Sequence, residues 1–452
     1  MYRVVLALLL FAFPLSSVDA APPEKAPAEI PNELTDYVSK EDASFSWKLL
    51  DKKEKFLGTV YTLEMVSQTW HKTKWDHKLI VLVPKGAKPQ STMVLWNEGD
   101  APDGDQAENT GLMIAGQIRA PVAFLFGVPK QPLYGGKTED ALIAESFVRY
   151  LVTEDGSWPL LFPMVKSIVR GMDAIQAFAK QEWKFEVKDF IIAGASKRGW
   201  TAWLTAATGD KRVKAISPLV FDSVHLAVQM ENQVKAFGGP SEMIRAYSER
   251  MLIPIPRTAA ASRLWKIIDP WSYRDRLTMP KMIVCGTNDP YWPLDALNTY
   301  WDGLKGDKWI LYVPNAGHYL CERDKDGKEE KLPLRTIATL CAFCRSQIFD
   351  KPMPKVNCDM IVPAGAESLD VSLLSDVKPL GARVYSTTAT TRDFRKSFWE
   401  EKTLAMPGTK AACKVELPKD GHRAALLELQ FELEDLKYTL STPLRILEAP
   451  KK

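Results

Sequence analysis

The sequence predicts an α/β fold built on a doubly wound, mainly parallel sheet, and three observations support this class. Short apolar runs typical of buried strands recur along the chain and alternate with segments of helical periodicity. Loops rich in glycine, proline, asparagine and aspartate follow these runs. The chain has 452 residues, 46% of them hydrophobic, so it can bury a large core in two or more domains. A parallel sheet is the simplest arrangement for such alternating strands and helices.

The first elements can be placed in chain order. Alternating hydrophobic and polar residues at 56–65 and 78–83 predict opening antiparallel strands. Apolar runs at 92–96 and 121–126 predict the next two strands, which end in N-E-G-D and G-V-P-K-Q-P-L. Residues 163–179 carry apolar side chains at helical spacing, so a helix is expected directly before the following strand.

The stretch 192–200, I-A-G-A-S-K-R-G-W, places a serine between a strand and a helix. The apolar residues 190–193 predict a buried strand, and Gly194 permits a sharp turn into a helix. Ser196 would stand at the tip of this turn, as the serine of a nucleophile elbow does. The Lys197 amide would then lie at a helix N-terminus, where it can donate to an oxyanion.

The motif departs from G-x-S-x-G, because Arg198 stands two residues after the serine and Gly199 follows one residue later. Tight elbows use small residues on both sides, so Arg198 is expected to point outward or to accompany a relaxed turn. Taken alone, such a string is more often an ordinary turn than a catalytic site. A catalytic interpretation therefore needs partner residues elsewhere in the chain.

Two downstream loops supply those partners in the chain order of α/β-hydrolases, which is nucleophile, acid and histidine. The apolar run 281–286 is followed by T-N-D-P-Y-W-P, which places Asp289 just beyond a strand. The run 309–313 is followed by P-N-A-G-H, which places His318 in the next such loop. Open α/β sheets build their sites at these strand ends. A serine hydroxyl needs a neutral imidazole to accept its proton and a carboxylate to orient that imidazole.

Each partner also has a plainer interpretation. Asp289 precedes a proline and could be a turn former, and Asp295 is the nearest competing acid, although its position suits the start of a helix. A lone histidine is usually structural, so the assignment of His318 depends on its place in the chain order. The other histidines lie outside any strand-end loop that could face the serine: His71, His77, His225 and His422.

Two further regions are expected beyond the parallel sheet. Residues 222–279 look mainly helical and predict a cap inserted into a main domain at 21–350. Prolines and short alternating runs predict a small β-sandwich-like domain at 351–452, which could bind a ligand or brace the main domain. Four aromatic residues could line a substrate cleft or pack in the core: Trp271, Tyr273, Tyr291 and Trp292.

The N-terminus has the pattern of a secretory signal peptide at residues 1–20. One positive charge at Arg3 precedes the apolar segment 4–14, and 18–20 offer a small-residue cleavage site. The apolar segment is short for a transmembrane span. We therefore expect export to the periplasm or the cell exterior, with no integral membrane span after the signal is removed.

Charge and cysteine content narrow the classes further. The net charge is +3 and basic residues are interspersed with acids, so no nucleic-acid-binding surface is expected. Export would permit disulfides, and Cys358 could pair with Cys413. Cys341 and Cys344 lack the second ligand pair of a zinc site, so no metal is expected there. No organic cofactor is expected either.

Six long segments match the pattern of one protein family. They are V-P-K-Q-P-L at 128–133, T-E-D-A-L-I-A at 138–144, W-P-L-L-F-P-M-V-K-S at 158–167, G-A-S-K-R-G-W-T at 194–201, D-P-W-S-Y-R-D-R-L-T-M-P-K at 269–281 and Y-V-P-N-A-G-H at 312–318. On these segments the chain resembles the PhoPQ-activated pathogenicity-related (PqaA-like) proteins of the α/β-hydrolase superfamily. It departs from them at Lys130, which replaces an asparagine, and in the acid loop, where Asp289 and Asp295 align with the two aspartates of G-D-x-F-x-x-P-D.

This resemblance covers nearly the whole mature chain and implies an α/β-hydrolase fold. It implies no substrate, because the family is defined by its regulation and sequence. The charged segments 138–140 and 269–276 are interpreted as structural ion-pair networks rather than as catalytic or binding groups.

The sequence therefore favours a secreted serine hydrolase that acts on a small or polymer-linked carboxylic ester. Ser196 would attack the carbonyl, His318 would transfer the proton and Asp289 would orient His318. A peptidase or an acyltransferase could use the same triad, and a non-catalytic envelope binding protein is the alternative from another class. The sequence specifies no oligomeric state. By analogy with other α/β-hydrolases, the oxyanion is expected to bind backbone amides among these residues: Lys197, Asn97 and Glu98.

Overall fold

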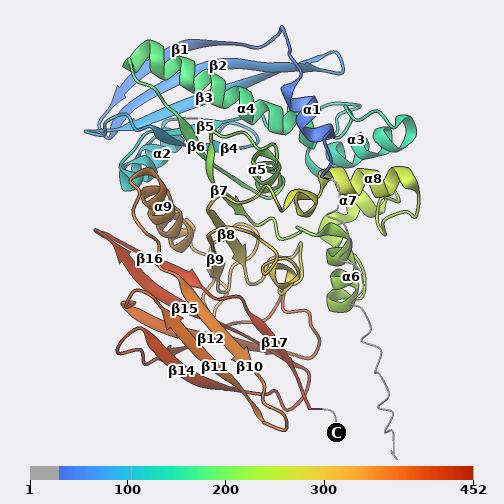
Figure 1. Cartoon of the computed structure of the whole chain (residues 1–452), viewed down its shortest axis with the longest axis vertical. Helices are drawn as coiled ribbons and strands as arrows, with labels where there is room; N and C mark the ends of the chain where they lie inside the picture. The colour runs from blue at the N-terminus through green and yellow to red at the C-terminus, as the bar shows by residue number, and fades with distance from the viewer. Residues whose placement is uncertain (1–29, 103, 451–452) are drawn as a thin grey trace, which may run out of the picture. The chain divides into compact units, whose positions relative to one another are not determined.

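The computed structural model describes residues 30–102 and 104–450, and the described residues from Pro31 onward form one compact unit (Figure 1). The expected signal peptide, residues 1–20, lies outside the described residues. The centre of the unit is a parallel sheet whose strands are, in spatial order, β5 (Val122–Leu125), β4 (Thr92–Asn97), β6 (Asp189–Ala195), β7 (Val213–Leu219), β8 (Lys281–Gly286) and β9 (Lys308–Val313). Antiparallel strands extend it beyond β5: β3 (Thr73–Pro84), β2 (Gly58–Trp70) and β1 (Ser46–Lys55).

Helices cover both faces of this sheet, which confirms the expected doubly wound α/β-hydrolase fold. On one face α4 (Leu161–Phe178) packs against α5 (Lys197–Ala207) and β2, and α1 (Glu33–Ser39) lies against α4. On the other face α2 (Asp105–Ile118) packs against α9 (Leu334–Ile348) and β3. In the described ranges, no helix combines the length and the apolar character that a membrane crossing requires.

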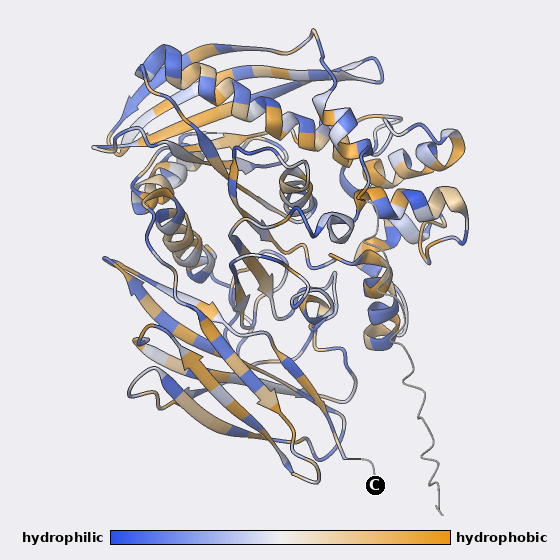
Figure 2. Cartoon of the chain, viewed as in Figure 1, coloured by the Kyte–Doolittle hydropathy of each residue, from blue (hydrophilic) through white to orange (hydrophobic). Residues whose placement is uncertain are grey.

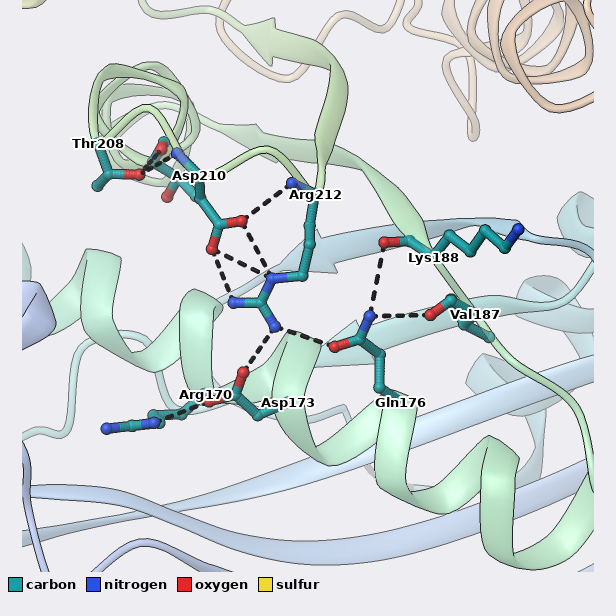
Figure 3. A network of polar contacts seen from close by, with 9 residues as sticks. Arg170, Asp173, Gln176, Val187, Lys188, Thr208, Asp210 and Arg212 are labelled. Atoms are coloured by element: carbon teal, nitrogen blue, oxygen red, sulfur yellow. Dashed lines mark hydrogen bonds and ion pairs between the residues drawn. The ribbon is translucent and has the colours of Figure 1, made fainter.

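A polar network fixes α4 beside the strands that carry the site (Figure 3). Arg212, the residue before β7, donates to Asp173 at 2.6 Å and to Gln176 at 3.0 Å, both on α4. It also pairs with Asp210 at 2.7 Å. Gln176 donates in turn to the Val187 carbonyl at 2.8 Å, just before β6. The helix, which continues into the π-helical turn η1 (Ala179–Trp183), is therefore held to the beginnings of two central strands.

The expected helical cap lies between β7 and β8 (Figure 1). Its elements are α6 (Leu226–Phe237), η2 (Glu242–Ile244), α7 (Arg245–Ser248), α8 (Ala259–Ile268) and η3 (Pro270–Tyr273), and α3 (Glu139–Thr153) contacts both α7 and α8. Buried Asp269 ties the two ends of the cap together, because its carboxylate accepts from the amides of His225, Leu226 and Trp271 at 3.0, 2.7 and 2.9 Å. Asp269, the first residue of the charged segment 269–276, therefore has a structural role, because it holds the two ends of the cap together.

The C-terminal residues are β-rich, as the sequence predicts, but their larger sheet continues the central one. β16 (Leu436–Ser441) joins β9 through the pair Ser441 and Ile310. The strands beyond β16 are β15 (His422–Leu433), β12 (Gly381–Ala389) and β13 (Glu400–Leu404), and β17 (Arg445–Glu448) also pairs with β15. A second sheet contains β10 (Val356–Ile361), β11 (Ser368–Ser375) and β14 (Lys410–Glu416). Hydrophobic and hydrophilic residues alternate along these C-terminal strands (Figure 2).

The expected disulfide between Cys358 and Cys413 is wrong. These residues lie on β10 and β14, which flank β11, and both are free cysteines. Two strand spacings separate their backbones by about 9.6 Å, whereas a disulfide requires Cα atoms within about 7 Å. Within the part of the chain that the structure describes, no group of three or more His, Cys, Asp or Glu side chains is placed to hold a metal ion.

Candidate active site

Ser196 occupies a strained turn between β6 and α5. Its φ and ψ are 57° and −128°, a conformation that costs free energy for any residue other than glycine and is typical of functional sites. Glycines on both sides make the turn possible. A Cβ on Gly194 would lie 2.8 Å from the Arg198 carbonyl oxygen, and one on Gly199 would lie 2.9 Å from that of Leu219. The spacing G-x-S-x-x-G therefore produces a tight elbow.

The structure corrects the expected orientation of Arg198, which is buried beneath the elbow instead of pointing outward. Its guanidinium donates to both carboxylate oxygens of Glu139 at 2.7 and 2.8 Å and to the Val128 carbonyl at 2.8 Å. Lys197 also pairs with Glu139, at 2.7 Å. Burial alone would raise the pKa of Glu139, but these two cations lower it to about 2. This ion-pair network anchors the elbow to the loop after β5 and to the start of α3.

The structure brings Asp289 and His318 together. Asp289 follows β8, His318 follows β9, and the Asp289 Oδ2 atom lies 2.8 Å from His318 Nδ1. The Tyr291 amide donates to the other carboxylate oxygen at 2.8 Å, and the Tyr291 ring stacks on the His318 imidazole at 4.2 Å. Both contacts fix the orientation of the pair. The two loops touch directly, since a Cβ on Gly286 would overlap the carbonyl oxygen of Ala316.

Asp295, the competing acid, points elsewhere. It pairs with Arg392 at 2.5 Å and accepts from the Asn232 side chain at 3.2 Å. It stands at the start of η4 (Ala296–Thr299), near the position that the sequence suggests for it, although its side chain makes no capping hydrogen bond. Its side chain thus joins the C-terminal region to the cap.

The three oxyanion candidates differ in their surroundings. Lys197 is the first residue of α5, so its amide has no acceptor one turn earlier within the helix. The Glu98 amide already donates to the Leu125 carbonyl at 2.8 Å. Asn97 ends β4, and its buried side-chain amide donates to the carbonyls of Ala193 and Arg198 at 2.9 and 3.2 Å. The Asn97 side chain therefore links β6 to the start of α5 and stabilises the turn between them.

A small cavity opens at Ser196, walled mainly by aromatic and aliphatic side chains from the elbow and the cap. Of the four aromatic residues considered in the sequence, Tyr291 and Trp292 line this cavity. The other two pack: the Trp271 ring stacks on His225 at 4.7 Å, and buried Tyr273 donates its hydroxyl to the Ile267 carbonyl at 2.8 Å. Tyr291 thus contacts His318 and borders the cavity of Ser196.

Asp222 is a buried carboxyl close to this site that the sequence analysis did not single out. It follows the strand β7, and that strand-end position was the available signal. Tyr300 donates its hydroxyl to Asp222 Oδ1 at 2.7 Å. Burial raises the pKa of Asp222 to about 7 against the lowering effect of hydrogen bonds from Tyr300 and Cys285, and Asp289 and Asp295 raise it further.

Replacing Asp222 with asparagine should make stability less sensitive to pH. An aspartate in the unfolded chain titrates near pH 4, so between about pH 4 and 7 the folded protein binds more protons than the unfolded one and loses stability as the pH rises. The full cost of ionising Asp222, on the order of 4 kcal/mol, applies above pH 7. Urea unfolding should show Asp222→Asn gaining stability over wild type from pH 4.5 to 8. A stability difference that does not change with pH would contradict this assignment.

The chain is similar to known proteins both in sequence and in structure. A family model described as PhoPQ-activated pathogenicity-related protein matches residues 34–395. Autocrine proliferation repressor protein A of Dictyostelium discoideum is 30% identical over 388 residues, which are 80% of this chain and 76% of that protein. An acetyl xylan esterase from a Paenibacillus species is similar in structure at 14% identity and a TM-score of 0.46, covering 70% of this chain and 92% of its own. A glucuronoyl esterase from Solibacter usitatus is similar in structure at 11% identity and a TM-score of 0.41, covering 70% of this chain and 91% of its own. The family match spans most of the sequence, and the chain belongs to the PhoPQ-activated pathogenicity-related protein family.

Proposed function

We propose that this protein is a serine hydrolase that cleaves carboxylic esters through Ser196, His318 and Asp289. The observation that carries the proposal is the 2.8 Å contact between Asp289 and His318 in two strand-end loops of a sheet whose elbow holds Ser196 at a positive φ. A serine in this backbone conformation destabilises the fold, and such strain is typical of nucleophiles that project from a strand-to-helix turn.

The proposed reaction has two halves. His318 accepts the hydroxyl proton as Ser196 Oγ bonds to the carbonyl carbon, and Asp289 stabilises the imidazolium through Nδ1. The imidazolium then gives its proton to the leaving oxygen as the ester C–O bond breaks. Water, deprotonated by His318, then attacks the acyl carbon; the bond to Ser196 Oγ breaks, His318 returns the proton to Ser196, and the acid is released. The developing oxyanion would bind the Lys197 amide, where the α5 helix dipole also favours negative charge.

The second oxyanion donor would come from the end of β4 or the loop after it. The Glu98 amide can serve only if it exchanges its bond to the Leu125 carbonyl for the oxyanion. The Asn97 amide belongs to the last residue of β4, directly before this loop. We therefore assign the Lys197 amide as the principal donor and retain Asn97 and Glu98 as candidates for the second.

Two other functions remain as alternatives. A peptidase or acyltransferase would use the same groups, and Ser196-dependent cleavage of peptides without cleavage of esters would favour the peptidase. A non-catalytic binding protein is favoured by one observation, which is that the Dictyostelium relative carries the name of a proliferation repressor. Because of the signal-like segment 1–20, we propose an exported protein for every alternative.

A fluorophosphonate probe separates the catalytic from the non-catalytic alternatives. Wild-type protein, Ser196→Ala and His318→Ala should be treated with an ethyl fluorophosphonate, and the labelled peptide identified by mass spectrometry. We expect labelling at Ser196, no label in Ser196→Ala and labelling at least 100-fold slower in His318→Ala, because the hydroxyl is a weak nucleophile without its base. Wild type that is folded by circular dichroism yet unlabelled would move the assignment to a binding protein.

A further inference from the structure

Two hollows of very different size adjoin the residues of the proposed triad. The cavity at Ser196 has a volume of about 50 Å³, and the groove at His318 has a volume of about 580 Å³. Tyr291 lines both hollows, and its ring stacks on the His318 imidazole at 4.2 Å. The small hollow therefore lies at the proposed nucleophile, and the large one lies at the proposed base.

The cavity at Ser196 suits a short apolar group. Its volume is less than a tenth of that of the groove at His318, so it suits a smaller group than the groove does. Its wall includes Trp200, Phe221, Leu226, Trp265 and Trp292. Most of these side chains are buried or held in the core, so close packing limits how far the wall can expand.

Charges at the edge of this cavity are neutralised. Asp140 lies 3.2 Å from the Lys197 ammonium and accepts the Tyr247 hydroxyl at 3.2 Å. An uncharged acyl group can therefore enter without removing an unpaired charge from water, which would be costly. An additional ionic group on the acyl chain would find these charges already paired.

The groove at His318 is polar, and the C-terminal region forms part of it. Thr391, Asp393, Arg395 and Lys396 line it opposite His318. Arg395 is held rigidly, because it pairs with Asp393 at 2.7 Å and with Glu242 of the cap at 2.9 Å. The C-terminal region thereby supplies one wall of the groove. The exposed Tyr319 ring, 87% accessible, offers an apolar face on which a sugar-like ring could pack.

Chemistry decides which half of an ester lies in which hollow. In the proposed reaction His318 protonates the leaving oxygen, so the alcohol must lie on the His318 side and the acyl group on the opposite side. We propose, on the basis of the function proposed above, that the substrate joins a short acyl group to a large polar alcohol of the saccharide type. The cavity sets the acyl length, and the groove receives the alcohol.

The test measures acylation with p-nitrophenyl acetate, butyrate and octanoate, from the burst of p-nitrophenol. Wild type should react with acetate and butyrate at least 100-fold faster than with octanoate, because a longer chain must displace packed side chains. Met230→Ala shortens a partly exposed side chain of the cavity wall and should narrow this ratio at least tenfold. Met243→Ala is the matched control, since Met243 lies in the same cap but lines the groove. It should leave the ratio unchanged.

The alcohol side is tested by comparing methyl acetate with mono-acetylated maltotriose. The saccharide ester should have at least a tenfold lower KM than methyl acetate in wild type, and Lys396→Ala should raise the KM of the saccharide ester more than it raises the KM of methyl acetate. Equal rates for acetate and octanoate, or no acylation by any ester while Ser196 is labelled by the fluorophosphonate, would overturn the inference and leave the activated serine intact. Absence of labelling in folded protein would instead overturn the proposed function itself.

Discussion

Asp289→Asn should lower kcat/KM for p-nitrophenyl acetate by about 10⁴-fold while leaving the fold intact. An asparagine can keep the 2.8 Å contact to His318 Nδ1, but it favours the wrong imidazole tautomer and carries no charge to stabilise the imidazolium. The Tyr291 amide can still donate to the side-chain oxygen at this position, so the loop should retain its shape. Steady-state kinetics near neutral pH, with thermal unfolding as the check on folding, measure the effect.

Asp295→Asn is the matched control for this prediction. The same chemical change is made six residues later. There the carboxylate bonds to Arg392 and Asn232 instead of to His318. We expect a change in kcat/KM of less than about tenfold. A large loss with Asp295→Asn and a small one with Asp289→Asn would reverse the assignment of the acid. Equal and small effects would show that His318 works without either carboxylate.

The strands that position these residues could be predicted because each strand can be identified from its own apolar sequence. The apolar runs before Ser196, Asp289 and His318 became β6, β8 and β9, with boundaries shifted by a residue or two at most. A buried parallel strand is apolar on both faces, so its sequence identifies it without knowledge of its neighbours. The contact between Asp289 and His318 then follows from the meeting of strand ends at one edge of the sheet.

The environment of the site could not be predicted in the same way, because it depends on contacts between distant segments. Nothing near Arg198 indicates that its partner is Glu139, 59 residues earlier in the chain. The cavity wall combines the elbow with the cap, and the groove adds residues 391–396, so neither exists until the whole chain is packed. The link between β9 and β16 likewise depends on strand pairing across more than 120 residues.

Arg198→Met should destabilise the protein by about 3 kcal/mol. The substitution keeps much of the side-chain volume but leaves the Val128 carbonyl without its donor and removes the bidentate partner of Glu139. Removing one member of a buried ion pair typically costs about 3–5 kcal/mol. The value here should fall at the lower end, because the Glu139 side chain is 37% exposed and Lys197 still neutralises it. The change in the free energy of unfolding can be measured by urea denaturation.

Two further variants show whether the cost arises from the buried ion pair. Arg119 also pairs with two carboxylates, Glu434 and Asp435, but its side chain is 46% exposed, so Arg119→Met should cost less than about 1 kcal/mol. Combining Arg198→Met with Glu139→Gln should cost less than the sum of the two single changes, because each single change already removes the pair between these residues. If the two costs instead added in full, the arginine would act mainly through its packing against Gly99 and the loop after β4. The guanidinium would then stabilise the elbow by its shape, and its charge would be secondary.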